Sequence, residues 1–125
     1  MFKQSCISAF IKKAAFLVCA APLVVMAQEW PNKPITFVVP FPAGGGTDAF
    51  ARPLAAQLTK QLGKQIVIDN RGGAGGTLGA SIAAKAAPDG YTFFMGAAHH
   101  AIAPAMYPNL DYDIEKSFIP VAMVA

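Results

Sequence analysis

Outside its first 27 residues the sequence has no cysteine and no excess of either charge. Both cysteines of the 125-residue chain, Cys6 and Cys19, lie in that opening segment, so the remainder offers no thiol for a disulfide, a zinc site or a nucleophile. Three of the ten basic residues and none of the seven acidic residues lie there too, which leaves seven charges of each sign in the remainder. The pI near 9.0 therefore comes from the opening segment, and we expect no nucleic-acid partner.

The opening segment also lacks an apolar run long enough to span a membrane. Three lysines precede an apolar run over residues 14–26, and Val25-Met26-Ala27 fits the small-residue rule for signal-peptide cleavage before Gln28. An uncleaved amphipathic anchor and lipidation at Cys19 are the alternatives. We therefore expect export to the periplasm, with the signal peptide (residues 1–27) cleaved after Ala27.

From Gln28 onward the sequence alternates between strand and helix patterns. The apolar residues at 35–39 predict a strand buried on both faces, as in a parallel sheet covered by helices. Two further strands are predicted at residues 65–69 and 91–95, the last after a Pro88-Asp89-Gly90 turn. Helical spacing follows each of the first two strands. The order is therefore βαβαβ, an α/β fold with a parallel sheet and right-handed crossovers.

The predicted helices carry start and stop signals. The first begins near Thr47 or Asp48, either of which suits an N-cap, and stops at Gly63. Pro53 lies inside it, so we expect either a kink or an irregular first turn. The second helix is expected to pack one face closely on the sheet, formed by Leu78, Ile82, Ala83 and Ala86.

Beyond Gly96 the pattern is weaker. A short helix is expected to open over residues 97–102 and to be limited by Pro104 or Pro108. The apolar run at residues 118–125 has the pattern of a strand that is just beginning. Because a complete domain rarely ends in such a run, we expect this sequence to be the front part of a longer protein.

Glycine is concentrated at the carboxyl ends of the first two predicted strands. The first turn reads Ala43-Gly44-Gly45-Gly46-Thr47-Asp48, and the second reads Arg71-Gly72-Gly73-Ala74-Gly75-Gly76-Thr77. Such turns expose backbone N–H groups beside the positive end of a helix dipole, which favours an anion. Glycine can also serve only the backbone geometry of a tight turn. Two such turns in one sheet favour a ligand site, because ligands of open α/β sheets bind beyond the carboxyl ends of strands.

A dinucleotide site is the main alternative. Gly44-x-Gly46-x-x-Ala49 fits the G-x-G-x-x-G/A pattern, and Asp69 ends the next strand where a ribose-binding acid is expected in an NAD(P)-dependent enzyme. Against it, residues 40–43 separate the strand from its glycines, Asp48 adds negative charge at the helix start, and export removes the chain from the cofactor pool. A P-loop does not fit, since no Gly-Lys-Ser/Thr follows either turn.

Residues suited to catalysis are scarce. No serine lies at a strand-to-helix elbow, and the two histidines, His99 and His100, are adjacent and so point in different directions. They either have no specific role, line a ligand pocket or bind a metal. Arg71 either reaches an anion or is a solvated surface residue. Asp48 and Arg52 are four residues apart and are expected to pair on the helix surface. We predict no catalytic residue, no metal and no cofactor.

Four ordered motifs run from Trp30 to the end of the chain. They are Trp30-Pro31-x-Lys33-Pro34-Ile35 with Val39-Pro40-Phe41-Pro42-Ala43-Gly44-Gly45-Gly46-Thr47-Asp48, then Asp69-Asn70-Arg71-x-Gly73-Ala74-Gly75-Gly76, then Ala84-Lys85-Ala86-Ala87-Pro88-Asp89-Gly90-Tyr91-Thr92, and finally Tyr112-Asp113 with Phe118-x-Pro120-Val121. In this order they resemble the Bug family, the periplasmic solute receptors of tripartite tricarboxylate transporters.

The resemblance implies a two-lobed, type II-like periplasmic binding protein that closes on its ligand without catalysis. The implied ligand is a small carboxylate, or a related amide or aromatic acid, which backbone N–H groups and waters hold and which is delivered to the membrane subunits of the transporter. We expect a monomer. The implied ligand-binding residues are Phe41, Ala43, Gly44, Gly45, Gly46 and Thr47 in the first loop, Asn70, Gly73, Ala74, Gly75, Gly76 and Thr77 in the second, and Ala98, His99 and His100 after the third strand.

Members of this family are well over twice as long as this chain. We therefore expect residues 28–117 to form the first lobe and residues 118–125 to begin a crossover strand toward a missing second lobe. A lobe truncated in this way should bind its ligand weakly, because closure supplies the other half of the contacts. Three residues depart from the family pattern: Gly72 replaces a usual proline, Thr77 replaces a common asparagine, and Pro53 lies within the first helix.

Overall fold

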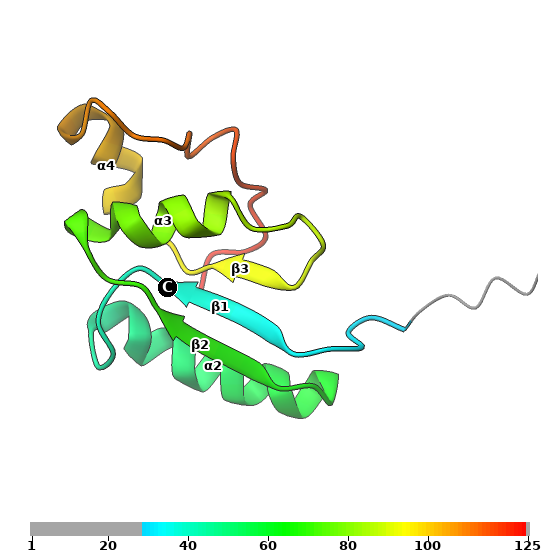
Figure 1. Cartoon of the computed structure of the whole chain (residues 1–125). Coiled ribbons are helices and arrows are strands. Elements are labelled where there is room, and N and C mark those ends of the chain that lie inside the picture. The colour runs from blue at the N-terminus through cyan, green and yellow to red at the C-terminus, as the bar shows by residue number, and fades with distance from the viewer. Residues whose placement is uncertain (1–28, 125) are drawn as a thin grey trace, which may run out of the picture.

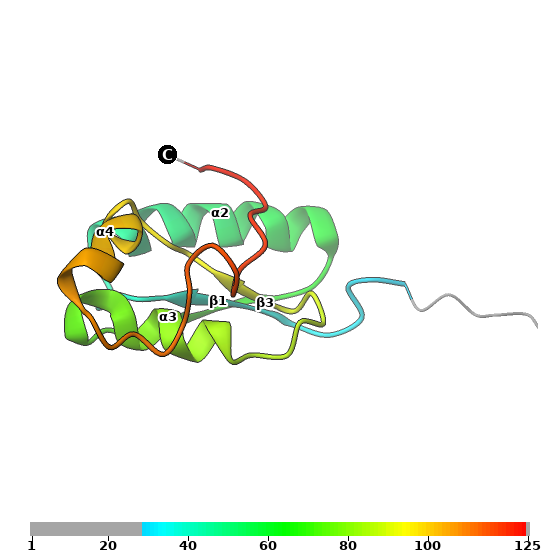
Figure 2. The same cartoon turned by 90° about the horizontal axis from the view of Figure 1, so that it is seen from above.

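The computed structural model of the chain describes residues 29–124, in which helices cover both faces of one parallel sheet (Figures 1 and 2). The sheet has the order β2–β1–β3, with β1 at Ile35–Val39, β2 at Ile66–Asn70 and β3 at Thr92–Phe94. Both pairings are parallel, and they place Ile35 opposite Ile66 and Thr36 opposite Thr92. The predicted parallel βαβαβ unit is therefore confirmed, with a third strand shorter than expected.

The central strand forms the middle of the core, as its apolar run predicts. Ile35 and Phe37 of β1 are buried and pack with Ala55 and Ile66. Phe37 also meets Phe93 of β3 edge-on, with 5.9 Å between ring centroids. Helices cover both faces of a parallel sheet, so its central strand is apolar on both sides. The apolar run at residues 35–39 predicted this burial.

Helix α2, at Gly46–Leu62, covers one face of the sheet and contacts β1 and β2 (Figure 2). It ends at Gly63, whose φ of +64° is left-handed and whose N–H donates to the Thr59 carbonyl at 3.1 Å, so the predicted stop is confirmed. The helix continues through Pro53. This residue and Ala49, whose carbonyl loses its helical donor, both lie on the exposed side, where water can replace the missing hydrogen bond.

The predicted N-cap of α2 is wrong. The capping position is Gly45, which has extended backbone and no side-chain cap hydrogen bond. Asp48 lies within the first turn instead, and its carboxylate accepts a hydrogen bond from the N–H of Gly44, outside the helix, at 2.8 Å. The carboxylate therefore binds the loop that leads into the helix, which sequence spacing alone does not distinguish from a cap.

Helix α3, at Thr77–Ala84, covers the opposite face. Its predicted contact face is wrong at the two large residues, Leu78 and Ile82, whereas Ala83 and Ala86 are partly buried. Leu78 and Ile82 are 48% and 39% exposed, while Gly79 and Ala80 are buried. A Cβ at Gly79 would lie only 2.7 Å from the Arg71 carbonyl oxygen. The small residues therefore face the sheet because the helix approaches it too closely for larger side chains, which turn outward.

The C-terminal part confirms one prediction and contradicts another. Helix α4, at His99–Met106, continues through Pro104 and ends before Pro108, the second of the two expected limits. Residues 118–124 form no strand, although a strand was expected to begin at 118. The Phe118 ring stacks on Phe94 at 5.0 Å between centroids, but the apolar residues after it are mostly exposed. No strand among residues 29–124 lies beyond β3 to pair with this segment.

The predicted signal peptide, with its cleavage point after Ala27, lies outside the described residues. Within residues 29–124, no helix combines the length and the apolar character that crossing a membrane would require.

The packing of α3 predicts that Gly79→Ala destabilises the fold by roughly 1–3 kcal/mol, because backbone atoms of Arg71 and Pro40 occupy the space of the new methyl group. Ile82→Ala, on the exposed side of the same helix, should change the free energy of unfolding by less than about 1 kcal/mol. Urea denaturation of both variants measures the difference. A larger loss for Ile82→Ala would show that the helix packs with the face that the sequence pattern indicated.

Candidate functional site

Three loops meet at one edge of the sheet, because the carboxyl ends of parallel strands all point the same way (Figure 1). Loop 1 (residues 40–45) joins β1 to α2, loop 2 (residues 71–76) joins β2 to α3 and contains the short 3-10 helix η2 at Ala74–Gly76, and loop 3 (residues 95–98) joins β3 to α4. The beginnings of all three helices therefore lie at this edge. Open α/β sheets bind their ligands in this position.

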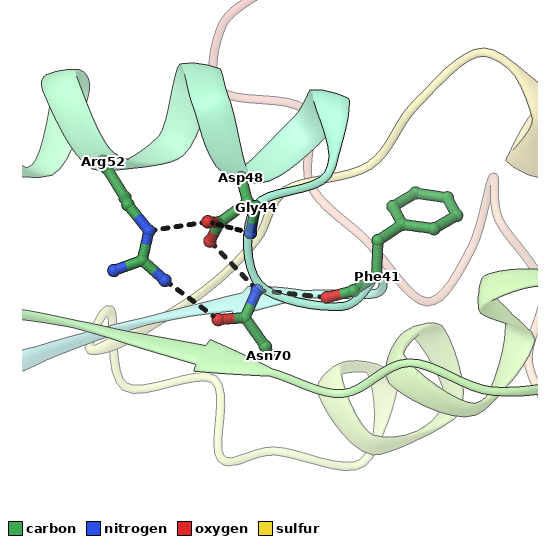
Figure 3. A network of polar contacts seen from close by, with 5 residues as sticks. All are labelled: Phe41, Gly44, Asp48, Arg52 and Asn70. Atoms are coloured by element: carbon green, nitrogen blue, oxygen red, sulfur yellow. Dashed lines mark hydrogen bonds and ion pairs between the residues drawn. The ribbon is translucent and has the colours of Figure 1, made fainter.

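A buried carboxylate connects loop 1 to α2 and β2 (Figure 3). Asp48 is 1% exposed. Its Oδ2 accepts hydrogen bonds from the Gly44 N–H at 2.8 Å and from the Arg52 Nε at 2.6 Å. Its Oδ1 accepts a third from the Asn70 Nδ2 at 3.0 Å. The pairing of Asp48 with Arg52 on an exposed helix surface is thus corrected: the pair forms, but the aspartate is buried and serves two further donors.

Asn70, the last residue of β2, joins the two glycine turns. Its Nδ2 also donates to the Phe41 carbonyl at 3.0 Å, and its Oδ1 accepts from the Arg52 Nη2 at 3.3 Å. One residue further, the Arg71 N–H donates to the Val39 carbonyl at 2.7 Å and continues the pairing of β1 with β2. Loop 1 is therefore held against the end of β2 by side-chain hydrogen bonds, and the backbone bond holds the adjoining end of β1.

The surroundings of Asp48 favour its ionised form. The hydrogen bond from Arg52, followed by those from Gly44 and Asn70, lowers the pKa of the Asp48 carboxyl to about 2, against the opposing effect of burial. The carboxylate is therefore negatively charged at neutral pH. Its place in the first turn of α2 also suits the positive end of the helix dipole.

A cluster of aromatic side chains from loop 1, β3 and the start of α4 packs against loop 2. The Phe41 ring of loop 1 meets His99 at 5.0 Å between centroids, and His99 lies 3.8 Å from His100. His100 in turn meets Phe94 edge-on at 4.9 Å. The adjacent histidines, predicted to point in different directions, both lie against Gly76 of loop 2. A Cβ at that glycine would be 2.9 Å and 3.1 Å from their Nε2 atoms, so loop 2 requires a residue without a side chain there.

His100 is 2% exposed and neutral at pH 7. Burial, more than any other cause, lowers the pKa of its imidazole, and the neighbouring His99 lowers it further. The Ala97 N–H lies 3.1 Å from Nδ1, and Nε2 lies 3.4 Å from the Gly76 carbonyl oxygen. A proton on Nε2 satisfies both contacts. His100 therefore links loop 3 to loop 2.

Several of the backbone N–H groups that we expected to bind an anion donate hydrogen bonds to acceptors in the protein itself. The N–H of Gly44 donates to Asp48, that of Gly45 to the Pro42 carbonyl at 3.2 Å, and that of Gly76 to the Gly73 carbonyl at 2.9 Å. The first N–H groups of α2, at Gly46 and Thr47, have no acceptor within the helix. These N–H groups, with those of loop 2 other than Arg71 and Gly76, are the ones suited to a ligand.

The fold brings together every residue that the family resemblance placed in the site, since all of them lie in the three loops, at the end of β2 or in the first turns of α2, α3 and α4. Sequence reasoning missed Tyr107, whose hydroxyl lies against Gly75 of loop 2. It follows α4 by one residue, and no spacing rule pointed to it.

The sequence left open two other kinds of site, one for a dinucleotide and one for a metal ion, and the structure shows where their candidate residues lie. Asp69, the candidate ribose-binding acid, forms an ion pair with Arg71 at 2.8 Å. The candidate dinucleotide glycines precede a helix whose first turn already contains the buried charge of Asp48. Among the described residues, no three histidine, aspartate or glutamate side chains lie close enough together to hold a metal ion.

Residues 50–125 match the family model of the tripartite tricarboxylate transporter family receptor. The chain belongs to this family. It is a family of solute-binding receptors, as the sequence motifs indicated.

BugT of Bordetella pertussis is 43% identical over 107 residues, which cover 84% of this chain and 32% of BugT. A protein in the tcbD-tcbE intergenic region of Pseudomonas sp. is 40% identical over 98 residues, 78% of this chain and 29% of that protein. The chain thus spans about 30% of the length of these curated relatives.

Solved structures of periplasmic binding proteins share this fold. MatC from Rhodopseudomonas palustris, solved with bound malate, is 46% identical with a TM-score of 0.69 over 76% of this chain and 33% of MatC. A second R. palustris protein, solved with adipate, is 41% identical with a TM-score of 0.60 over 68% of this chain and 29% of its own. The expected α/β lobe of a periplasmic binding protein is confirmed, and each match covers only part of the relative.

The lowered pKa of Asp48 predicts a pH-dependent stability. In the unfolded chain an aspartate titrates near about 3.9, so the ionised Asp48 stabilises the fold above about pH 4 and this contribution is lost as the pH falls toward about 2. Urea unfolding midpoints measured from about pH 6 to about pH 2.5 should therefore fall less steeply for Asp48→Asn than for the wild type.

Asp89→Asn is the matched control for this series. Lys33, more than any other group, lowers the pKa of the Asp89 carboxyl, but that ion pair lies at the surface, where solvent screens it. Its acid dependence should stay close to that of the wild type. Parallel curves for wild type and Asp48→Asn would contradict the buried, ionised aspartate.

Proposed function

We propose that this chain is the first lobe of an exported receptor that captures a small carboxylate, or a related amide or aromatic acid, for a tripartite tricarboxylate transporter. The observation that carries the proposal is the meeting of two glycine turns and three helix beginnings at one edge of a parallel sheet. Relatives solved with malate and with adipate support a carboxylate ligand.

The ligand is held by backbone N–H groups rather than by a buried cation. Arg52 and Arg71, the arginines beside the two turns, are each engaged by an aspartate, which leaves the beginnings of α2 and α3 as the anion-binding elements. Phe41, His99 and His100 form the apolar side of the site. The receptor binds and releases its ligand without chemical change, as a periplasmic monomer that delivers it to membrane subunits.

The described residues supply one side of the site, and residues 28–117 correspond to the first lobe. The relatives are about three times as long, and we infer that the part beyond the match forms a second lobe that closes over the ligand. The chain alone should therefore bind malate weakly, with a dissociation constant of about 1 mM or weaker.

Titration of the ¹⁵N-labelled whole chain with malate, followed by NMR, tests the proposal. Amide signals of Gly46, Thr47 and the residues of loop 2 should shift saturably, while those at the far end of the sheet, such as Gly63, stay in place. The neutral diamide of malate serves as the matched control and should produce a weaker response, because it lacks the charges that the helix dipoles favour.

Absence of saturable shifts in the three loops would refute the proposed ligand class. Calorimetry that gave micromolar malate affinity for this chain would instead refute the need for a second lobe.

A further inference from the structure

The two charges nearest the start of α2 differ sharply in their exposure to water. Asp48 is 1% exposed, whereas the side chain of its partner Arg52 is 54% exposed. Water and salt screen an exposed charge far more effectively than a buried one. The ion pair is therefore neutral in sum but leaves a negative potential around the buried carboxylate.

This negative charge lies within the proposed ligand site. Asp48 directly binds the N–H of Gly44 in loop 1, and through Asn70 it contacts the end of β2, where loop 2 begins. Neither α3 nor α4 has an acidic residue in its first turn. The other charged pair at this edge, Asp69 with Arg71, is partly exposed on both sides and so contributes little net potential.

We propose that Asp48 is a specificity-determining residue of this site, where its buried negative charge weakens the binding of anionic groups relative to neutral groups of the same shape. This inference rests on the proposed ligand site. The helix dipoles still favour an anion, but Asp48 offsets part of that preference. Charge then contributes less to recognition than shape and hydrogen bonding do, so neutral amides compete with carboxylates.

A structural role for Asp48 and a role in charge selection predict different effects on the preference for malate over its neutral diamide. Loss of a purely structural hydrogen bond would loosen loop 1 and weaken every ligand alike. Removal of the charge by Asp48→Asn leaves Arg52 without its counter-charge, so the preference for malate over its neutral diamide should rise. Arg52→Gln leaves the buried carboxylate without its cation, so the same preference should fall.

The experiment measures dissociation constants of malate and of its diamide for the whole chain by NMR titration in low salt. The ratio of the two affinities should rise about fivefold in Asp48→Asn and fall about fivefold in Arg52→Gln, as expected for one charge at a partly screened distance. Both changes should shrink when salt is added, because screening reduces them. Thermal unfolding first confirms that each variant is folded.

Two controls separate charge from structure. Arg52→Lys keeps the charge but loses the contact with Asn70, and Asn70→Ser removes the link between the turns without a change of charge. Both should weaken the two ligands while leaving their affinity ratio within about twofold of the wild type. If Asp48→Asn does not fold, the comparison of Arg52→Gln with Arg52→Lys decides the question alone.

The outcomes distinguish this inference from the proposed function. If the wild type binds malate but neither charge variant changes the ratio in its expected direction, the inference is overturned and the proposed function stands. If only Asp48→Asn binds malate, Asp48 opposes anions as inferred, and the proposed ligand class of the wild type fails. If no variant binds a carboxylate, both fail.

Discussion

The hydrogen bonding of the buried Asp48 carboxylate is the interaction on which the proposed ligand edge of this sheet depends. Three donors from three segments converge on it: Gly44 of loop 1, Arg52 of α2 and Asn70 of β2. A buried charge is stable only when it is paired and fully hydrogen-bonded, so these partners must be in place together. The glycine turn, which has little conformational preference of its own, thereby acquires a fixed position.

Fixing the first glycine turn determines which N–H groups face the proposed ligand. The N–H groups of Gly44 and Gly45 are turned inward, so the first turn of α2 and the residues of loop 2 remain as donors. On the other side, Phe41 and the two histidines hold loop 2 against loop 3. Because these contacts already hold the loops, the proposed ligand would lose little entropy in ordering them when it binds.

The sequence predicted most of the fold because its signals are local. The apolar run of β1 and the glycine after α2 depend on neighbours within a few residues, and both predictions were confirmed. The contact face of α3 was wrong, since periodicity favours Leu78 and Ile82 and says nothing of how closely Gly79 lets the helix approach Pro40. The burial of Asp48 was missed for a related reason: its decisive partner, Asn70, is 22 residues away.

Hydrogen exchange of the Gly44 amide measures whether the buried Asp48 carboxylate holds the first glycine turn. A glycine in a surface turn ordinarily exchanges quickly, but this N–H donates to a buried carboxylate. We expect Gly44 to be protected at least about tenfold more than Gly72, for which no internal acceptor is found among the described residues. Equal, rapid exchange of the two glycines would show that Asp48 does not hold the first turn, and the account of the site would fail.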